Sequence, residues 1–181
     1  MRISGGKARG IELKVPKGDR VRPATDGLRQ AVFSSLAAAI SGARFLDLFA
    51  GSGAYGLEAF SRGATGGLFV ERDARAAACI RQNIEAVARS VGAIGAADLS
   101  VTQADALQIA AAPPGPVPDL VFIDPPYEII PEVAPMLFER LTSLFAGRPS
   151  AIVVFELPGE LDLAPAGWSL VKRLGKGARQ P

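Results

Sequence analysis

The chain has 181 residues, of which 49% are hydrophobic and 21% charged, and its net charge is +2. This composition is ordinary for one globular domain with a hydrophobic core. Histidine is absent and Cys79 is the single cysteine, which excludes an internal disulfide, a serine–histidine triad and a multi-cysteine zinc site. No stretch approaches the roughly 18 apolar residues of a membrane helix, and the first residues lack the core of a signal peptide. We therefore expect a soluble, cytoplasmic protein without a metal.

The charge is unevenly distributed along the chain. The first 29 residues hold eight basic and three acidic side chains, a net charge of +5, and the segment from Lys172 adds four basic residues without an acid. The middle of the chain is correspondingly acidic. Basic ends on an acidic body favour contact between the termini and a polyanion, although solvated basic loops are the alternative.

The predicted elements begin with a small basic arm or β-hairpin over residues 1–24, where apolar and polar residues alternate. Thr25 or Asp26 can cap a helix whose apolar positions run to Ile40. Residues 25–181 then form one globular unit in which apolar strand-like runs alternate with helical segments. The expected strands lie near residues 45–49, 68–70, 99–102, 120–123, 151–155 and 168–174, and the expected further helices near 55–61, 74–89 and 132–143.

This alternation predicts a Rossmann-like, mostly parallel sheet with helices on both faces. Ligands of such sheets bind outside the carboxyl ends of the strands. Asp47 lies in the first strand with Gly51 and Gly53 just beyond it, and acidic residues end three other strands. These strand-ending residues are Glu71, Asp105 and Asp124. We expect the carboxylates to meet at one edge of the sheet.

The segment Asp124-Pro125-Pro126-Tyr127 directly follows an apolar run and suggests methylation of a flat amine. Proline restricts itself and the residue before it, so Asp124 and the Pro125 carbonyl become two acceptors with fixed directions. If these two acceptors bind both hydrogens of the exocyclic amine of a nucleobase, the lone pair of the nitrogen can point at an electrophile. Tyr127 can stack on that base. The alternative interpretation is a turn that only ends the strand.

Residues 51–56 satisfy the pattern G-x-G-x-x-G, with Glu71 placed to accept ribose hydroxyls, so a dinucleotide site is one interpretation. Three features disfavour NAD. The chain has no histidine for hydride-transfer chemistry, Asp47 would repel a pyrophosphate, and the Asp-Pro-Pro-Tyr segment would have no role. A cationic sulfonium that carries an ammonium group suits Asp47 better, and the glycines would then allow close approach of the backbone. An NAD-dependent oxidoreductase stays as an alternative.

Several segments together resemble the RsmD-type bacterial 16S ribosomal RNA guanine-N2 methyltransferases. The resembling segments are residues 3–6, 9–10, 22–26, 46–53, 56–59, 61–64 and 119–127, with Arg29 and Phe33. The similarity spans roughly residues 2–160 and is more specific than any one motif. It implies a class I S-adenosylmethionine-dependent methyltransferase that acts on the N2 amine of a guanine in 16S ribosomal RNA, free or within the small subunit or an assembly intermediate.

The charge of the arm, the motifs and the resemblance together assign three groups of residues. The cofactor site comprises Arg22, Thr25, Asp47, Gly51, Ser52, Gly53, Glu71, Arg72, Asp105 and Ala106. The guanine site comprises Asp124, Pro125, Pro126 and Tyr127, and the RNA-binding group comprises Lys7, Arg9, Lys14, Arg22 and Arg29. In the cofactor site, Glu71 would bind the ribose hydroxyls and Asp105 would lie near the adenine amine.

The chain departs from the family pattern at both ends. Ala24 replaces the expected threonine and Gly27 the usual arginine, which weakens the start of the helix. The family generally closes with a glycine turn and a last apolar strand, whereas residues 176–181 stop short of it. We therefore expect a shortened last strand and a poorly covered sheet edge.

Two other functions stay open. A methyltransferase with the same loop could act on another nucleic-acid amine or on a protein amide, because the basic arm favours nucleic acid without separating RNA from DNA. A non-catalytic RNA-binding relative that keeps the cofactor site is the second, although intact Asp124 and Tyr127 argue against it.

Overall fold

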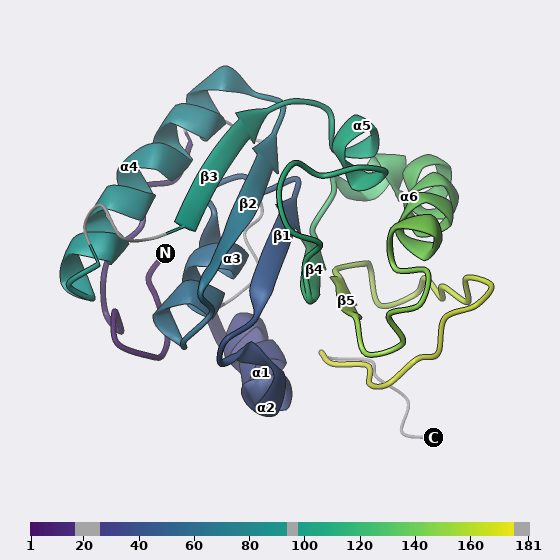
Figure 1. The fold of residues 1–181 in the computed structure, drawn as a ribbon, viewed down its shortest axis with the longest axis horizontal. Coiled ribbons are helices and arrows are strands. Elements are labelled where there is room, and N and C mark those ends of the chain that lie inside the picture. Colours follow the sequence, from purple (N-terminus) through teal and green to yellow (C-terminus); the bar gives the residue numbers. More distant parts are fainter. Residues whose placement is uncertain (17–25, 94–97, 176–181) are drawn as a thin grey trace.

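The computed structural model describes residues 1–16, 26–93 and 98–175, and its centre is a five-stranded sheet in the order β3-β2-β1-β4-β5 (Figure 1). The strands are β1 Arg44–Leu48, β2 Gly66–Glu71, β3 Asp98–Gln103, β4 Leu120–Ile123 and β5 Ile152–Phe155. Every neighbouring pair is parallel. The predicted parallel sheet is therefore confirmed. From β1, the chain adds β2 and β3 on one side and then β4 and β5 on the other, so β1 pairs with both β2 and β4.

Helices cover both faces of this sheet (Figure 1). The helices α1 Asp26–Ser35, α2 Ala37–Ile40, α3 Ala54–Ser61 and α4 Ala74–Ser90 contribute to one core cluster, and α5 Ala106–Ala110 and α6 Ile130–Leu144 contribute to the other. A short 3-10 turn, η1 Tyr127–Ile129, precedes α6. None of the described helices is long and apolar enough to cross a membrane.

The close packing of α3 on the sheet depends on a glycine. A Cβ atom at Gly56 would lie 2.4 Å from ring atoms of both Phe45 and Phe69, which themselves pack edge to face at 5.1 Å. Since real Cβ atoms do not approach other atoms so closely, a larger residue here would push α3 away from β1 and β2. Gly56 therefore sets how near the first turn of α3 comes to the end of β1.

The first 16 residues form a short antiparallel pairing whose bridge joins Arg2 to Glu12. Several hydrogen bonds attach this hairpin to Glu58 and Ser61 of α3. The Ser4 amide donates to a Glu58 carboxylate oxygen at 2.7 Å, and the Ala8 amide donates to the Ser61 hydroxyl at 2.9 Å. The basic arm is thus attached to the body of the protein instead of projecting from it.

Two predicted elements are wrong. The first helix does not run unbroken to Ile40, because Leu36 leaves helical geometry and separates α1 from α2. The strand expected over residues 168–174 does not form. Trp168 instead packs edge to face against Phe138 of α6 at 5.5 Å and donates its indole N–H to Thr142 at 2.8 Å. These contacts attach the segment to α6, so among the described residues β5 stays an edge strand paired only with β4.

Candidate active site

A sharp turn at the end of β1 brings the glycine loop against β2. Phe49 has a left-handed φ of 59°, and Gly51 and Gly53 follow with φ of 55° and 78°. The Gly51 amide then donates to Oε2 of Glu71 at 2.9 Å, while Oε1 of the same carboxylate accepts from the Asp73 amide at 2.8 Å. Glu71 therefore joins the glycine loop to the start of α4, and each of its oxygens keeps acceptor capacity for a ligand hydroxyl.

The Asp47 carboxylate lies beneath this loop with only 2% of the residue exposed. Its Oδ2 accepts from the Gly56 amide at 2.9 Å. Burial raises the pKa of Asp47 well above its ordinary value, and the charges of Asp124 and Glu71 raise the pKa further, while the Gly56 hydrogen bond partly opposes this. Such an edge fits a cationic ligand and would repel a pyrophosphate.

The glycines of this loop differ in what surrounds them. A Cβ at Gly51 would meet nothing nearer than a carbonyl oxygen at 4.0 Å, so this position leaves room for a ligand. A Cβ at Gly53 would lie 3.2 Å from both Ile80 and Phe69, so this glycine serves packing. Ser52 between them is buried and turns its hydroxyl toward the sulfur of Met1, at 3.4 Å.

The other proposed cofactor residues lie at the carboxyl ends of β2 and β3. Asp105 caps α5, because its Oδ1 accepts from the Leu107 amide at 2.7 Å. Ala106 is buried in the first turn of that helix, and Arg72 is exposed directly after Glu71. The structure thus places these residues along the same edge as Asp47.

The Asp-Pro-Pro-Tyr segment leaves the end of β4 beside β1. Asp124 is half-buried, and burial together with the neighbouring Glu156 raises its pKa to about 7. The Pro126 carbonyl accepts from the Ile129 amide at 3.1 Å and begins η1. Tyr127 is 45% exposed and lies three residues after Asp124.

Sequence reasoning missed two side chains of this edge, Glu156 and Tyr55. Glu156 directly follows β5, and Oε2 of its carboxylate accepts from the Tyr55 hydroxyl at 2.9 Å. The Tyr55 ring stacks on Phe122 of β4 at 5.4 Å. Burial raises the pKa of Glu156, and the Tyr55 hydrogen bond and the charge of Arg29 partly oppose this. The sequence signal for Glu156 is an acid directly after an apolar run, as at Glu71 and Asp124.

The prediction that Arg29 contacts RNA is wrong. Its side chain is 1% exposed, lies 2.6 Å from the Asp26 carboxylate and 3.6 Å from that of Glu58, and donates to the Arg2 carbonyl at 2.6 Å. These buried contacts leave no accessible charge. Arg22 and Thr25 lie outside the described residues.

The remaining basic residues of the hairpin are exposed. Lys7 and Arg9 lie on its surface, and Lys14 donates from Nζ to the Gln82 side chain at 2.7 Å. Their contact with RNA stays a prediction.

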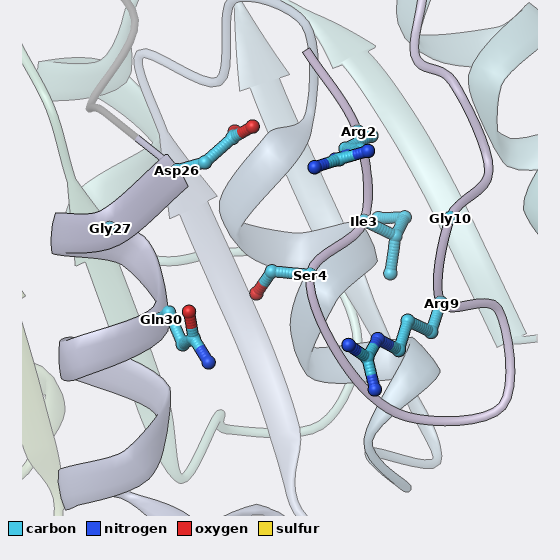
Figure 2. A pocket seen from close by; sticks show the side chains of 8 residues that line it. All are labelled: Arg2, Ile3, Ser4, Arg9, Gly10, Asp26, Gly27 and Gln30. Atoms are coloured by element: carbon cyan, nitrogen blue, oxygen red, sulfur yellow. The ribbon is translucent and has the colours of Figure 1, made fainter.

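Two cavities lie away from the carboxylate edge. One of about 250 Å³ separates the hairpin from the start of α1, and Figure 2 shows the Arg2 and Arg9 side chains beside it. Its lining residues are Arg2, Ile3, Ser4, Arg9, Gly10, Asp26, Gly27 and Gln30. The other, of about 350 Å³, lies between residues 113–118 and β1, β2 and β3. In the described part of the chain, no group of three or more acidic, cysteine or histidine residues is placed to hold a metal ion.

The strand order, the glycine loop after β1 and the acidic residues at the strand ends define the class I, Rossmann-like methyltransferase fold. The solved structure of yhhF from Escherichia coli shares this fold with a TM-score of 0.70 and 32% identity, over 97% of this chain and 92% of that one.

The family described as Conserved hypothetical protein 95 matches residues 1–180, and the chain belongs to it. Ribosomal RNA small subunit methyltransferase D of Escherichia coli K12 is 35% identical over 172 residues, which are 94% of this chain and 82% of the relative. The protein of the same name from Haemophilus influenzae is 30% identical, over 98% of this chain and 89% of the relative. The resemblance seen in the sequence motifs is thereby confirmed.

Proposed function

We propose that this protein transfers a methyl group from S-adenosylmethionine to the N2 amine of a guanine in small-subunit ribosomal RNA, in the cytoplasm. The observation that carries the proposal is the position of Asp124 at the same strand edge as Asp47 and Glu71. This edge combines acceptors for an amine with a carboxylate-rich site for a cation. The names of the E. coli and H. influenzae relatives support ribosomal RNA of the small subunit as the substrate.

The carboxylates suit the cofactor because several acidic side chains lie at one edge of the sheet and the cofactor carries a positive charge. S-adenosylmethionine, when bound, supplies an electrophilic methyl group on a positively charged sulfur. Asp47 would attract the cationic end, Gly51 leaves room for its approach, and Glu71 would accept from ribose hydroxyls with its remaining lone pairs. Asp105 would lie near the adenine amine.

The amine acceptor would be held by the end of β4. The N2 lone pair of guanine is delocalised into the ring, so the nitrogen becomes nucleophilic when its two hydrogens are fixed and the lone pair is turned toward the methyl group. Asp124 and the Pro125 carbonyl supply those two acceptors, and the exposed ring of Tyr127 supplies a stacking surface. Asp124 also stabilises the positive charge that develops on the amine and takes up a proton late in the reaction.

The hairpin would hold the RNA backbone. Lys7 and Arg9 are exposed on a segment that is fastened to α3, so their charges have a defined position relative to the strand edge. Basic side chains bind phosphates without regard to sequence, and such contacts position the RNA while the base site selects the nucleotide.

The decisive experiment incubates the protein with labelled S-adenosylmethionine and unmodified small-subunit ribosomal RNA, free or in subunits, and maps the methylated base. We expect label on the N2 position of one guanine. Asp124→Ala should reduce the single-turnover rate by on the order of 10²–10⁴ and leave cofactor affinity nearly unchanged. Label on ribosomal protein alone would refute the RNA substrate, and cofactor binding without turnover on free RNA or on subunits would refute the proposed enzymatic role.

A further inference from the structure

Asp124 and Glu156 occupy equivalent positions on neighbouring strands. Ile123 of β4 pairs in register with Phe155 of β5, and each acid is the next residue along its strand. The Glu156 amide donates to the Ile123 carbonyl at 2.9 Å, which continues the parallel pairing by one step. Neighbouring strands lie about 4.8 Å apart, so the two acids begin from adjacent backbone positions.

Both acids also lean toward the same face of the sheet. Successive strand residues point to opposite faces, and Phe122 and Val154, each two residues before an acid, belong to the core on the α3 side. Asp47 turns to this side as well, where it accepts from the first turn of α3. The three carboxylates therefore share one face and one edge.

Tyr55 fixes one oxygen of Glu156. Its hydroxyl donates to Oε2 at 2.9 Å while its ring stacks on Phe122, so the carboxylate is held from the α3 side. The described residues supply no hydrogen-bond donor to Oε1. Burial, together with repulsion from Glu156, raises the pKa of Asp124, and a ligand that brings N–H donors to both acids would relieve the repulsion.

We propose that Glu156 accepts the N1–H of the target guanine and thereby selects guanine over other bases, with Tyr55 as its positioning residue. The inference rests on the proposed methylation of a guanine N2 amine. Guanine carries N1–H directly beside that amine. If Asp124 and the Pro125 carbonyl hold the two amine hydrogens, N1–H needs a third acceptor on the same side, and Glu156 supplies it. A base with a lone pair at N1 would instead face a negative oxygen.

The test replaces the mapped guanine by 2-aminopurine in a synthetic RNA. This base keeps the N2 amine, lacks the O6 atom of guanine, and has an N1 lone pair in place of N1–H. In single-turnover assays, wild-type protein should methylate the guanine RNA roughly 10–100 times faster, the range for one hydrogen bond to a charged group. Glu156→Gln can keep its oxygen on Tyr55 and turn its NH₂ toward N1, so the preference should disappear or reverse.

Comparing the two RNAs separates recognition from a structural role. A Glu156 that only stabilised the fold would lower both rates by the same factor and leave their ratio unchanged, and that result would overturn the inference. Tyr55→Phe, which keeps the stacked ring and loses the hydroxyl, should reduce the ratio partially. If Glu156→Gln does not fold, the wild-type ratio can still overturn the inference, because equal rates on both RNAs contradict it. Wild-type protein that methylates neither RNA refutes the proposed function itself.

Discussion

Asp124→Asn should stabilise the protein most at high pH, because the variant removes a charge that the fold holds unfavourably. Burial and Glu156 raise the pKa of Asp124 from 3.8 to about 7. When folding raises the pKa of a carboxyl group, the group does not lower the stability of the protein at a pH below its pKa in the unfolded state, because both states are then protonated. Between about pH 4 and pH 7 only the folded state keeps it, so stability falls as pH rises, and above about pH 7 the full cost applies.

The size of the effect follows from the two pKa values. A tenfold difference in proton affinity corresponds to about 1.4 kcal/mol, so the full cost is about 4 kcal/mol. Part of it, about 1.5–2 kcal/mol, is already present at pH 5. The free-energy advantage of Asp124→Asn over wild type should therefore grow by about 2–3 kcal/mol between pH 5 and pH 8. The groups that face Asp124 are Asp47, Tyr55 and Glu156, and they are the same in both proteins.

Urea unfolding followed by circular dichroism at pH 5, 6, 7 and 8 measures this difference. Glu139→Gln, at an exposed position of α6, is the matched control, and its difference from wild type should change little with pH. An advantage of Asp124→Asn that is the same at pH 5 and pH 8 would show that Asp124 ionises normally in the folded protein. The catalytic counterpart is a wild-type single-turnover rate that rises with pH and levels off above about pH 7, because ionised Asp124 is the acceptor.

Three further predictions concern the cofactor site, the arm and the packing of α3. Glu71→Ala should weaken S-adenosylmethionine binding by about 1.5–3 kcal/mol in calorimetry, and unchanged affinity in a folded variant would remove Glu71 from the site. Reversing the charges of Lys7 and Arg9 should weaken RNA binding and reduce its salt dependence while cofactor affinity stays unchanged. Unchanged RNA affinity and salt dependence would show that these residues are only solvated. Gly56→Ala should lower the unfolding free energy by about 1–3 kcal/mol through overpacking. Gly27→Ala is the control, because its added Cβ meets no atom within 4 Å, and it should leave the unfolding free energy unchanged or raise it slightly. Equal effects of the two substitutions would contradict the packing argument.

The sheet and most of its acidic edge could be predicted because local pattern determines them. Most strands contain a short apolar run, and an acid directly after such a run lies at the carboxyl end of the strand whatever the tertiary details. Glu71 and Asp124 were identified in this way, and both lie at the edge. Asp105 was expected at the third strand end, and its capping of α5 agrees with that position.

The features that sequence reasoning missed depend on contacts between distant residues. The Tyr55 hydroxyl and Glu156 are 101 residues apart, so no local pattern joins them. Arg29 resembles its exposed neighbours in a basic segment, and only the folded chain brings it to Glu58. The strand expected near residue 170 fails for a similar reason, because the contacts of Trp168 with α6 outweigh local strand propensity.

Tight packing surrounds the acidic edge. Asp47, Asp124 and Glu156 lie on one face, each with a raised pKa, and the buried charge of Arg29 opposes this rise only at Glu156. Without surrounding contacts that hold them, the repelling carboxylates would move apart or become hydrated. The stacked ring of Tyr55 and the close approach of α3 at Gly56 prevent this, because neither the hydroxyl on Glu156 nor the amide on Asp47 can move without disturbing the aromatic core. The fold thereby keeps acceptors in place for a cation and for N–H donors, and it does so at the expense of its own stability.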